Sequence, residues 1–89
     1  MKSILTVIGK DQVGIIAGIS AELSKYHINI LNVTQTIMDG YFTMIMMLDG
    51  SNATATFEEI QKSLAAKGQE LKVDVKIQRE EIFNSMHTL

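Results

Sequence analysis

Residues 28–49 read INILNVTQTIMDGYFTMIMMLD, two strand-like runs separated by the dipeptide Asp39-Gly40. Apolar and polar residues alternate in the first run, which is typical of a strand with one buried face. An Asp-Gly pair between strand-like residues is the strongest short signal for a tight hairpin turn. The stretch therefore predicts an antiparallel hairpin of residues 28–38 and 41–49. The side chains of the first run expected on one face are Leu31, Val33 and Ile37.

The chain on each side of the hairpin supplies one helix and one more strand. Residues 3–9, SILTVIG, form a short apolar run ended by glycine, and from Asp11, a plausible N-cap, the apolar spacing becomes helical. Residues 56–59, TFEE, have the spacing of a capping box, and Gly68 stands where a left-handed residue would end that helix. Residues 71–78 alternate without interruption and predict the last strand. The side chains expected to face inward are Ile16, Ile19, Leu23 and Tyr26 in the first helix, and Leu71, Val73, Val75 and Ile77 in the last strand.

The element order β-α-β-β-α-β predicts an α+β, ferredoxin-like sandwich. Right-handed crossovers and the tight hairpin give a four-stranded antiparallel sheet of order 4-1-3-2, with two helices on one face. The two central strands carry apolar residues on both faces, so a second subunit or the C-terminal arm should cover the face that the helices leave open. We expect one domain, residues 1–79, followed by a C-terminal arm or short helix at residues 80–89.

Composition excludes several classes of protein. The 89 residues carry a net charge of -2 and include no cysteine, which rules out disulfides, thiolate metal sites and a cysteine nucleophile. Lysine and arginine do not cluster, so a nucleic-acid partner is not expected. The apolar run near the N-terminus is too short for a secretory signal or a membrane span. The expected setting is the cytoplasm, without a membrane partner.

Catalytic signatures are missing from the sequence. His27 lies near a helix end and His87 in the tail, and neither has the spacing of a metal site or a catalytic triad. Paired carboxylates, a P-loop and a dinucleotide fingerprint do not occur. We therefore expect no enzyme activity, no metal and no cofactor.

Three short features lie in a characteristic order. They are a D-x-x-G-I pattern at Asp11, Gly14 and Ile15, a helix running to residues 26–27, and Asn29-Ile30 at the start of the next strand. In this order and spacing, the chain resembles a stand-alone ACT domain, similar to the modules of the glycine-cleavage transcriptional repressor. The resemblance extends through Arg79. It implies a regulatory module that binds amino acids between two copies, usually as a homodimer.

Elementary chemistry suggests how the loop before the first helix would bind a ligand. Amides at a helix N-terminus carry a partial positive charge, so those of residues 12–15 are suited to a carboxylate, and Gly14 has no Cβ to block the approach. Asn29 offers an acceptor and donors. Asp11 would either receive an ammonium group or, as a helix cap, repel a carboxylate. The expected ligand-binding residues are Asp11, Gln12, Val13, Gly14, Ile15 and Asn29.

Structural roles for the same residues remain open. Gly14 also suits a simple turn, and Asn29 also suits backbone capping at a strand start. Many ACT relatives have proline where this chain has Val13, and serine-sensing relatives have asparagine at Asp11 and histidine at Gly9. The alternatives to a sensor that acts on a partner protein are an interaction or dimerisation module without ligand, and an RNA-binding domain or an enzyme. The sheet of an RNA-binding module would need more aromatic residues and basic residues.

Overall fold

The hairpin predicted from residues 28–49 is present in the computed structural model, which describes residues 2–10 and 12–81. Its closing pair is Met38 with Tyr41. Asp39 and Gly40 both have positive φ, 52° and 79°, as the favoured two-residue hairpin turn requires. A register shift between Ile30 and Asn32 inserts a bulge near the start of the first strand.

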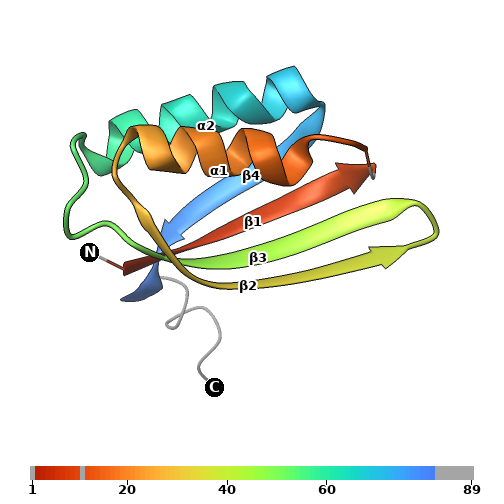
Figure 1. The fold of residues 1–89 in the computed structure, drawn as a ribbon, viewed down its shortest axis with the longest axis horizontal. Helices are drawn as coiled ribbons and strands as arrows, with labels where there is room; N and C mark the ends of the chain where they lie inside the picture. The colour runs from red at the N-terminus through yellow and green to blue at the C-terminus, as the bar shows by residue number, and fades with distance from the viewer. Residues whose placement is uncertain (1, 11, 82–89) are drawn as a thin grey trace.

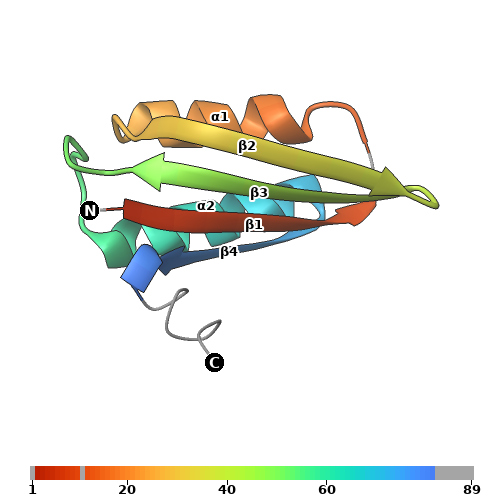
Figure 2. The same cartoon turned by 90° about the horizontal axis from the view of Figure 1, so that it is seen from below.

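Six elements alternate as the sequence predicts, and the sheet has the order β2-β3-β1-β4 with antiparallel pairing throughout. The fold is therefore the α+β, ferredoxin-like sandwich, with β2 and β4 at the edges. Both helices lie on one face of the sheet, and Figure 2 views the molecule from the other face (Figures 1 and 2). The elements are β1 (Lys2–Lys10), α1 (Ile15–Lys25), β2 (Asn29–Met38), β3 (Tyr41–Asp49), α2 (Phe57–Leu71) and β4 (Val73–Arg79).

The hydrophobic core fills the space between the sheet and the two helices. On β1 and β3 every second side chain points into it, and a fully buried aliphatic side chain contributes about 1.5 to 3 kcal/mol. The methionines Met44 and Met46 are completely buried and help to fill this core. The buried core residues are Leu5, Val7, Ile15, Ile19, Leu23, Ile28, Phe42, Met44, Met46, Leu48, Ile60, Leu64 and Ile77.

Helix α1 begins later than the sequence suggested. Its N-cap is Gly14, in the left-handed conformation with φ of 95°, and the helix starts at Ile15. The buried stripe is Ile15, Ile19 and Leu23, whereas Ile16 is 41% exposed. The prediction that Ile16 faces inward was wrong, because residues four apart share a helix face and Ile15 occupies that stripe. The proposed cap, Asp11, lies outside the described residues.

Helix α2 starts as predicted and ends later. The Glu59 amide donates to the Thr56 hydroxyl oxygen at 3.2 Å, which is the forward half of the capping box. The helix then continues through the buried Gly68 to Leu71 and ends on Lys72, whose φ is 61°. The prediction that Gly68 ends the helix was therefore wrong.

Close packing explains the glycine at position 68. A Cβ there would lie 2.7 Å from Val75 Cγ2 and 3.0 Å from the Val73 carbonyl oxygen. Gly68 thus lets α2 approach β4 closely, which no larger residue would permit without a shift. The last strand correspondingly begins at Val73 rather than at Leu71, which belongs to the helix.

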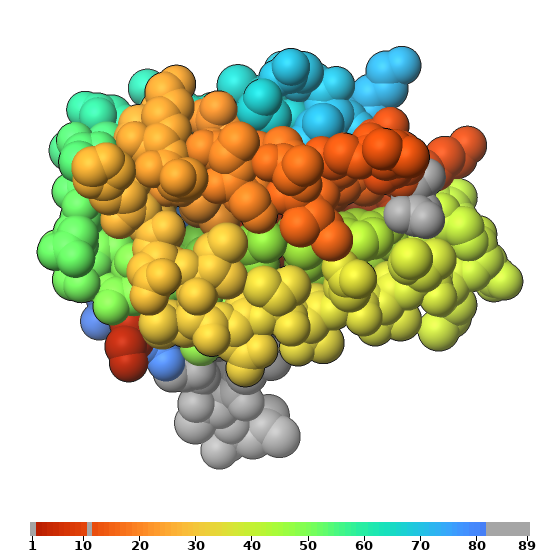
Figure 3. Space-filling model, viewed as in Figure 1, coloured from red at the N-terminus to blue at the C-terminus, as the bar shows by residue number. Residues whose placement is uncertain are grey.

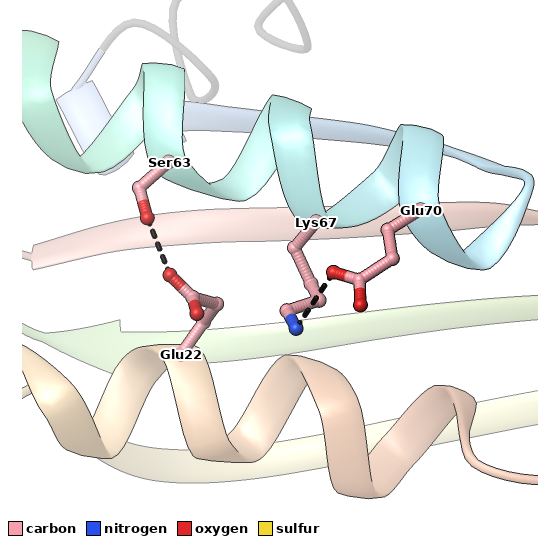
Figure 4. A network of polar contacts seen from close by, with 4 residues as sticks. All are labelled: Glu22, Ser63, Lys67 and Glu70. Atoms are coloured by element: carbon pink, nitrogen blue, oxygen red, sulfur yellow. Dashed lines mark hydrogen bonds and ion pairs between the residues drawn. The ribbon is translucent and has the colours of Figure 1, made fainter.

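One hydrogen bond connects the two helices, and an ion pair lies within α2. The Ser63 hydroxyl donates to a Glu22 carboxylate oxygen, and Lys67 pairs with Glu70 at 2.9 Å (Figure 4). The hydrogen bond to Glu70 raises the pKa of Lys67. Of these two contacts, the hydrogen bond between Ser63 and Glu22 links α2 to α1.

Candidate functional site

The start of α1 leaves backbone donors without acceptors inside the helix. The first intrahelical bond runs from the Gly18 amide to the Gly14 carbonyl at 2.8 Å, so the amides of residues 15–17 precede the helical ladder. No acidic residue lies in the first turn. A Cβ at Gly14 would meet nothing within 4 Å, so the space beside this backbone is open. This combination suits a small anion.

The loop before α1 is exposed, and one of its side chains is already engaged. Gln12, Val13 and Gly14 are exposed, and Val13 has as much accessible surface as in an extended chain, 102%. The Gln12 side-chain amide donates to the Leu71 carbonyl oxygen at the end of α2. Ile15 is 2% exposed, and its side chain belongs to the hydrophobic core. Asp11 lies outside the described residues.

The later start of α1 changes which amides form the candidate anion site. Sequence reasoning assigned the amides of residues 12–15, whereas the helix geometry assigns those of Ile15, Ile16 and Ala17. Ile16 and Ala17 were therefore missed. Their signal was Gly14 itself, because glycine is favoured in a left-handed residue that directly precedes the first helical turn.

Asn29 lies at the other end of the sheet from the Gly14 loop. It is exposed, and it pairs across β2 and β3 with Asp49, which in turn pairs with Lys2. The Gly14 loop follows Lys10, eight residues further along β1, a distance of about 27 Å. Figure 1 shows the start of β2 and the start of α1 at opposite ends of the molecule. A single chain therefore does not bring the predicted ligand-binding residues together.

A carboxylate that the sequence did not single out lies beside Asn29. The Ser51 amide donates to Asp49 Oδ1 at 3.0 Å, and this hydrogen bond holds the pKa of Asp49 below its ordinary value. Asp49 therefore carries its negative charge throughout the neutral range. Together Asn29 and Asp49 offer acceptors suited to an ammonium group, whereas the α1 amides offer donors suited to a carboxylate.

Strand β2 exposes both its backbone edge and apolar side chains. Of its ten residues, none is buried. Val33 and Ile37 point to the helix side, opposite Met46 and Phe42, yet they remain 42% and 56% exposed. Figure 3 shows β2 uncovered along the side of the molecule, next to α1. A long edge strand with exposed apolar residues is a template for pairing with another strand.

Two hollows in the described part of the chain are lined by residues other than those of the α1 start, the Asn29–Asp49 pair and the β2 edge. One hollow of about 470 Å³ is lined by Lys2, Arg79, Glu80 and Glu81, and another lies between α2 and β4. Within residues 2–10 and 12–81, no group of three or more histidine, aspartate or glutamate side chains is placed to hold a metal. In the same ranges no helix is both long and apolar enough to cross a membrane.

Comparison with known proteins identifies the family. The family model described as the ACT domain matches residues 3–78. The chain belongs to the ACT domain family. A UPF0237 protein of Listeria monocytogenes is 60% identical over 89 residues, which cover all of both chains. The family resemblance drawn from the sequence is thereby confirmed, and ACT domains are regulatory modules.

Solved structures agree with this assignment. An ACT domain protein from Streptococcus pneumoniae superimposes with a TM-score of 0.82 at 40% identity, and the match covers 93% of each chain. A glycine cleavage system transcriptional repressor matches with a TM-score of 0.73 over 86% of this chain and 44% of the other. At 19% identity, the second likeness shows the fold alone.

Proposed function

We propose that this ACT domain is a non-catalytic regulatory module that binds an amino acid, or a similar small molecule, between two copies of the chain. Occupancy of the site then modulates a partner protein. The support comes from the family and from two sets of groups with complementary chemistry. Amides at the start of α1 suit the carboxylate of an amino acid, and Asn29 with Asp49 suits its ammonium group.

The observation that carries the proposal is the separation of these two sets within one chain. In an antiparallel pairing of two β2 strands centred between Val33 and Thr34, residue 29 of one copy lies opposite residue 38 of the other. Met38 is on the same cross-strand row as Tyr41 and Lys10, where β1 leads into the Gly14 loop. Figure 2 shows α1 along the β2 side of the sheet. A dimer of this kind brings Asn29 of one copy to the loop end of its partner.

The exposed side chains favour pairing through this edge. Ile16 of α1 and Val33 and Ile37 of β2 are each between 41% and 56% exposed on the same side of the molecule. Pairing of two β2 strands would bury these residues while the backbone groups of the edge form hydrogen bonds. We expect light scattering at micromolar concentration to give twice the chain mass.

A thermal-shift panel of the twenty amino acids and related carboxylates tests ligand binding. A molecule that binds only the folded state adds about 2.7 kcal/mol at one hundred times its dissociation constant, so its Tm shift should be large. The Asn29→Ala variant should lose the response while keeping the unliganded Tm. A panel without any response from the intact dimer would count against the proposal.

A second candidate is an interaction module that does not bind a ligand. Val13 favours it, because a fully exposed apolar side chain at the tip of the loop is suited to protein contact rather than to a polar small molecule. This alternative predicts no thermal shift with any metabolite, an intact dimer, and capture of one partner protein whether or not metabolites are present.

A further inference from the structure

The loop before α1 is joined to the C-terminal end of α2 by a single side chain. The Gln12 side-chain amide donates to the carbonyl oxygen of Leu71, which lies 59 positions later in the sequence. Figure 1 shows the start of α1 and the end of α2 at the same end of the molecule. The contact therefore connects two segments that are distant in sequence and adjacent in space.

The acceptor is a carbonyl that α2 cannot satisfy by itself. The last four carbonyls of a helix have no donor within the helix, so other groups must bind them. The Lys72 amide donates to the carbonyls of Gly68 and Gln69, and Leu71 is the last residue of the helix. Gln12 is therefore a side-chain cap for the C-terminus of α2, supplied by the loop before α1.

Little else in the described chain holds residues 12–14. All three are exposed, and a Cβ at Gly14 would meet nothing within 4 Å. Among the described residues, the only hydrogen bond from this loop to an element other than α1 is that of Gln12. A segment with few buried contacts opens locally while the rest of the domain stays folded. Loss of this one bond should therefore release the loop and the Gly14 N-cap without unfolding the sheet or the helices.

Leu71 also contacts α1 through its side chain. A Cβ added at Gly18 would lie 2.9 Å from Leu71 Cδ1, so this side chain packs against α1 where the glycine leaves room. The Gly18 amide donates the first bond of the helical ladder, to the Gly14 carbonyl. The loop and the first turn of α1 thus share one anchor, the last residue of α2.

We propose that Gln12 is a positioning residue for the candidate ligand site. Its side chain binds α2 rather than the ligand, and it holds the loop that leads into the amides of residues 15–17. This role rests on the proposed function, because it requires those amides to bind a carboxylate. A site that is competent for only part of the time has its affinity reduced by that fraction. Holding the loop in one conformation therefore increases affinity without adding a ligand contact.

The position of the loop can be tested without any ligand. In the full-length chain, Gln12→Met keeps the length of the side chain, removes the donor and adds no charge. Backbone ¹⁵N relaxation should show the order parameters of residues 12–14 falling from about 0.85 to below about 0.6, while those of β1 and α2 stay unchanged. Gln69→Met makes the same change at an exposed glutamine of α2 and should leave the loop as rigid as in the parent.

The effect on binding is read by calorimetric titration with glycine and with the amino acid that gives the largest thermal shift. Gln12→Met should raise the dissociation constant at least about fivefold, since the loop then spends less time in the competent conformation. Thr56→Ala removes a cap at the other end of α2 and serves as the control for stability. It should leave the dissociation constant within about twofold of the parent value, because it does not touch the loop.

Three results would overturn the inference. They are unchanged order parameters in Gln12→Met, a released loop with an unchanged dissociation constant, and an equal loss of affinity in Thr56→Ala. A parent chain that binds no amino acid contradicts the proposed function instead, and the relaxation data still decide whether Gln12 holds the loop. If order is lost throughout the chain, the variant has unfolded, and the shorter amide of Gln12→Asn is then read by the same criteria.

Discussion

The two helices of this domain begin in opposite ways. At α2, the Thr56 hydroxyl accepts the Glu59 amide, and Glu58 and Glu59 place negative charge in the first turn. At α1, the N-cap is Gly14, with no side-chain cap and no acidic residue in the first turn. Both helices face the same requirement for acceptors at their first amides. The α2 start meets it with a side chain of its own, and the α1 start is where we propose that a ligand supplies the acceptor.

The same difference extends across the sheet. On the side of α2 and β4, Gly68 allows helix and strand to touch at van der Waals distance. On the side of α1 and β2, the edge strand has no buried residue. The α2–β4 side is thus closely packed against itself. The α1–β2 side carries the surfaces that we propose for the ligand and for the partner copy.

The largest expected effect concerns the close packing between α2 and β4. Gly68→Ala should destabilise the chain by about 1 to 2 kcal/mol, because overpacking against the Val73 carbonyl outweighs the gain in helix propensity. Gly18→Ala on α1 is the matched control. Its Cβ would meet only the flexible tip of Leu71, at 2.9 Å, so stability should stay equal or rise by up to about 1 kcal/mol. Urea unfolding measures both, and equal losses would contradict the comparison.

A negative charge placed at the N-terminus of α1 should weaken ligand binding. Aspartate and asparagine tolerate the left-handed conformation of Gly14 better than other residues. Gly14→Asp puts a carboxylate beside the α1 amides and should reduce affinity for an amino acid at least about tenfold, whereas the isosteric Gly14→Asn should retain more of it. Calorimetric titration checks this pair. Equal losses for the two variants would show that charge at this position is irrelevant.

Removing the N-cap side chain of α2 should destabilise the chain less than the Gly68 substitution does. Thr56→Ala leaves the Glu59 amide without its acceptor and should lower the free energy of unfolding by about 1 kcal/mol. Thr56→Ser keeps the hydroxyl and should be nearly neutral. Thermal unfolding of the two variants measures this difference. An alanine variant as stable as the parent would contradict the proposed difference between the N-termini of α1 and α2.

The smallest effect is a pH dependence at the Asn29 end. Because the folded-state pKa of Asp49 is lowered, this group stabilises the fold at neutral pH, and the contribution disappears as pH falls below about 4 through the folded pKa. Asp49→Asn should therefore lose less stability between pH 7 and pH 3 than the parent does. Asp74→Asn on β4 serves as control, and an equal change in both variants would rule out the Ser51 hydrogen bond as the cause.

The alternation of apolar and polar residues, together with the turn and capping residues, was sufficient to predict the fold. The Asp39-Gly40 turn and the alternation around it identified the hairpin, and the TFEE sequence located the start of α2. Glycine misled at position 68, because its role there depends on the distance between α2 and β4, which no local pattern encodes.

The candidate site was predictable only in part. Gly14 and Asn29 stood out by residue type, but the number of residues between them says nothing about their separation across the sheet. Asp49 was missed for a specific reason. A regular hairpin from the Asp39-Gly40 turn would pair it with Ile30, and only the bulge before Asn32 moves Asn29 opposite to it.

One measurement tests most directly the claim that two copies share the site. It is calorimetric titration of an equimolar mixture of Asn29→Ala and Gly14→Asp chains with the amino acid that gives the largest thermal shift. In a mixed dimer, the intact loop of one copy meets the intact Asn29 of the other, so random exchange should restore roughly a quarter of the sites although neither variant binds alone. A mixture as inactive as its two components would contradict a site built from two copies.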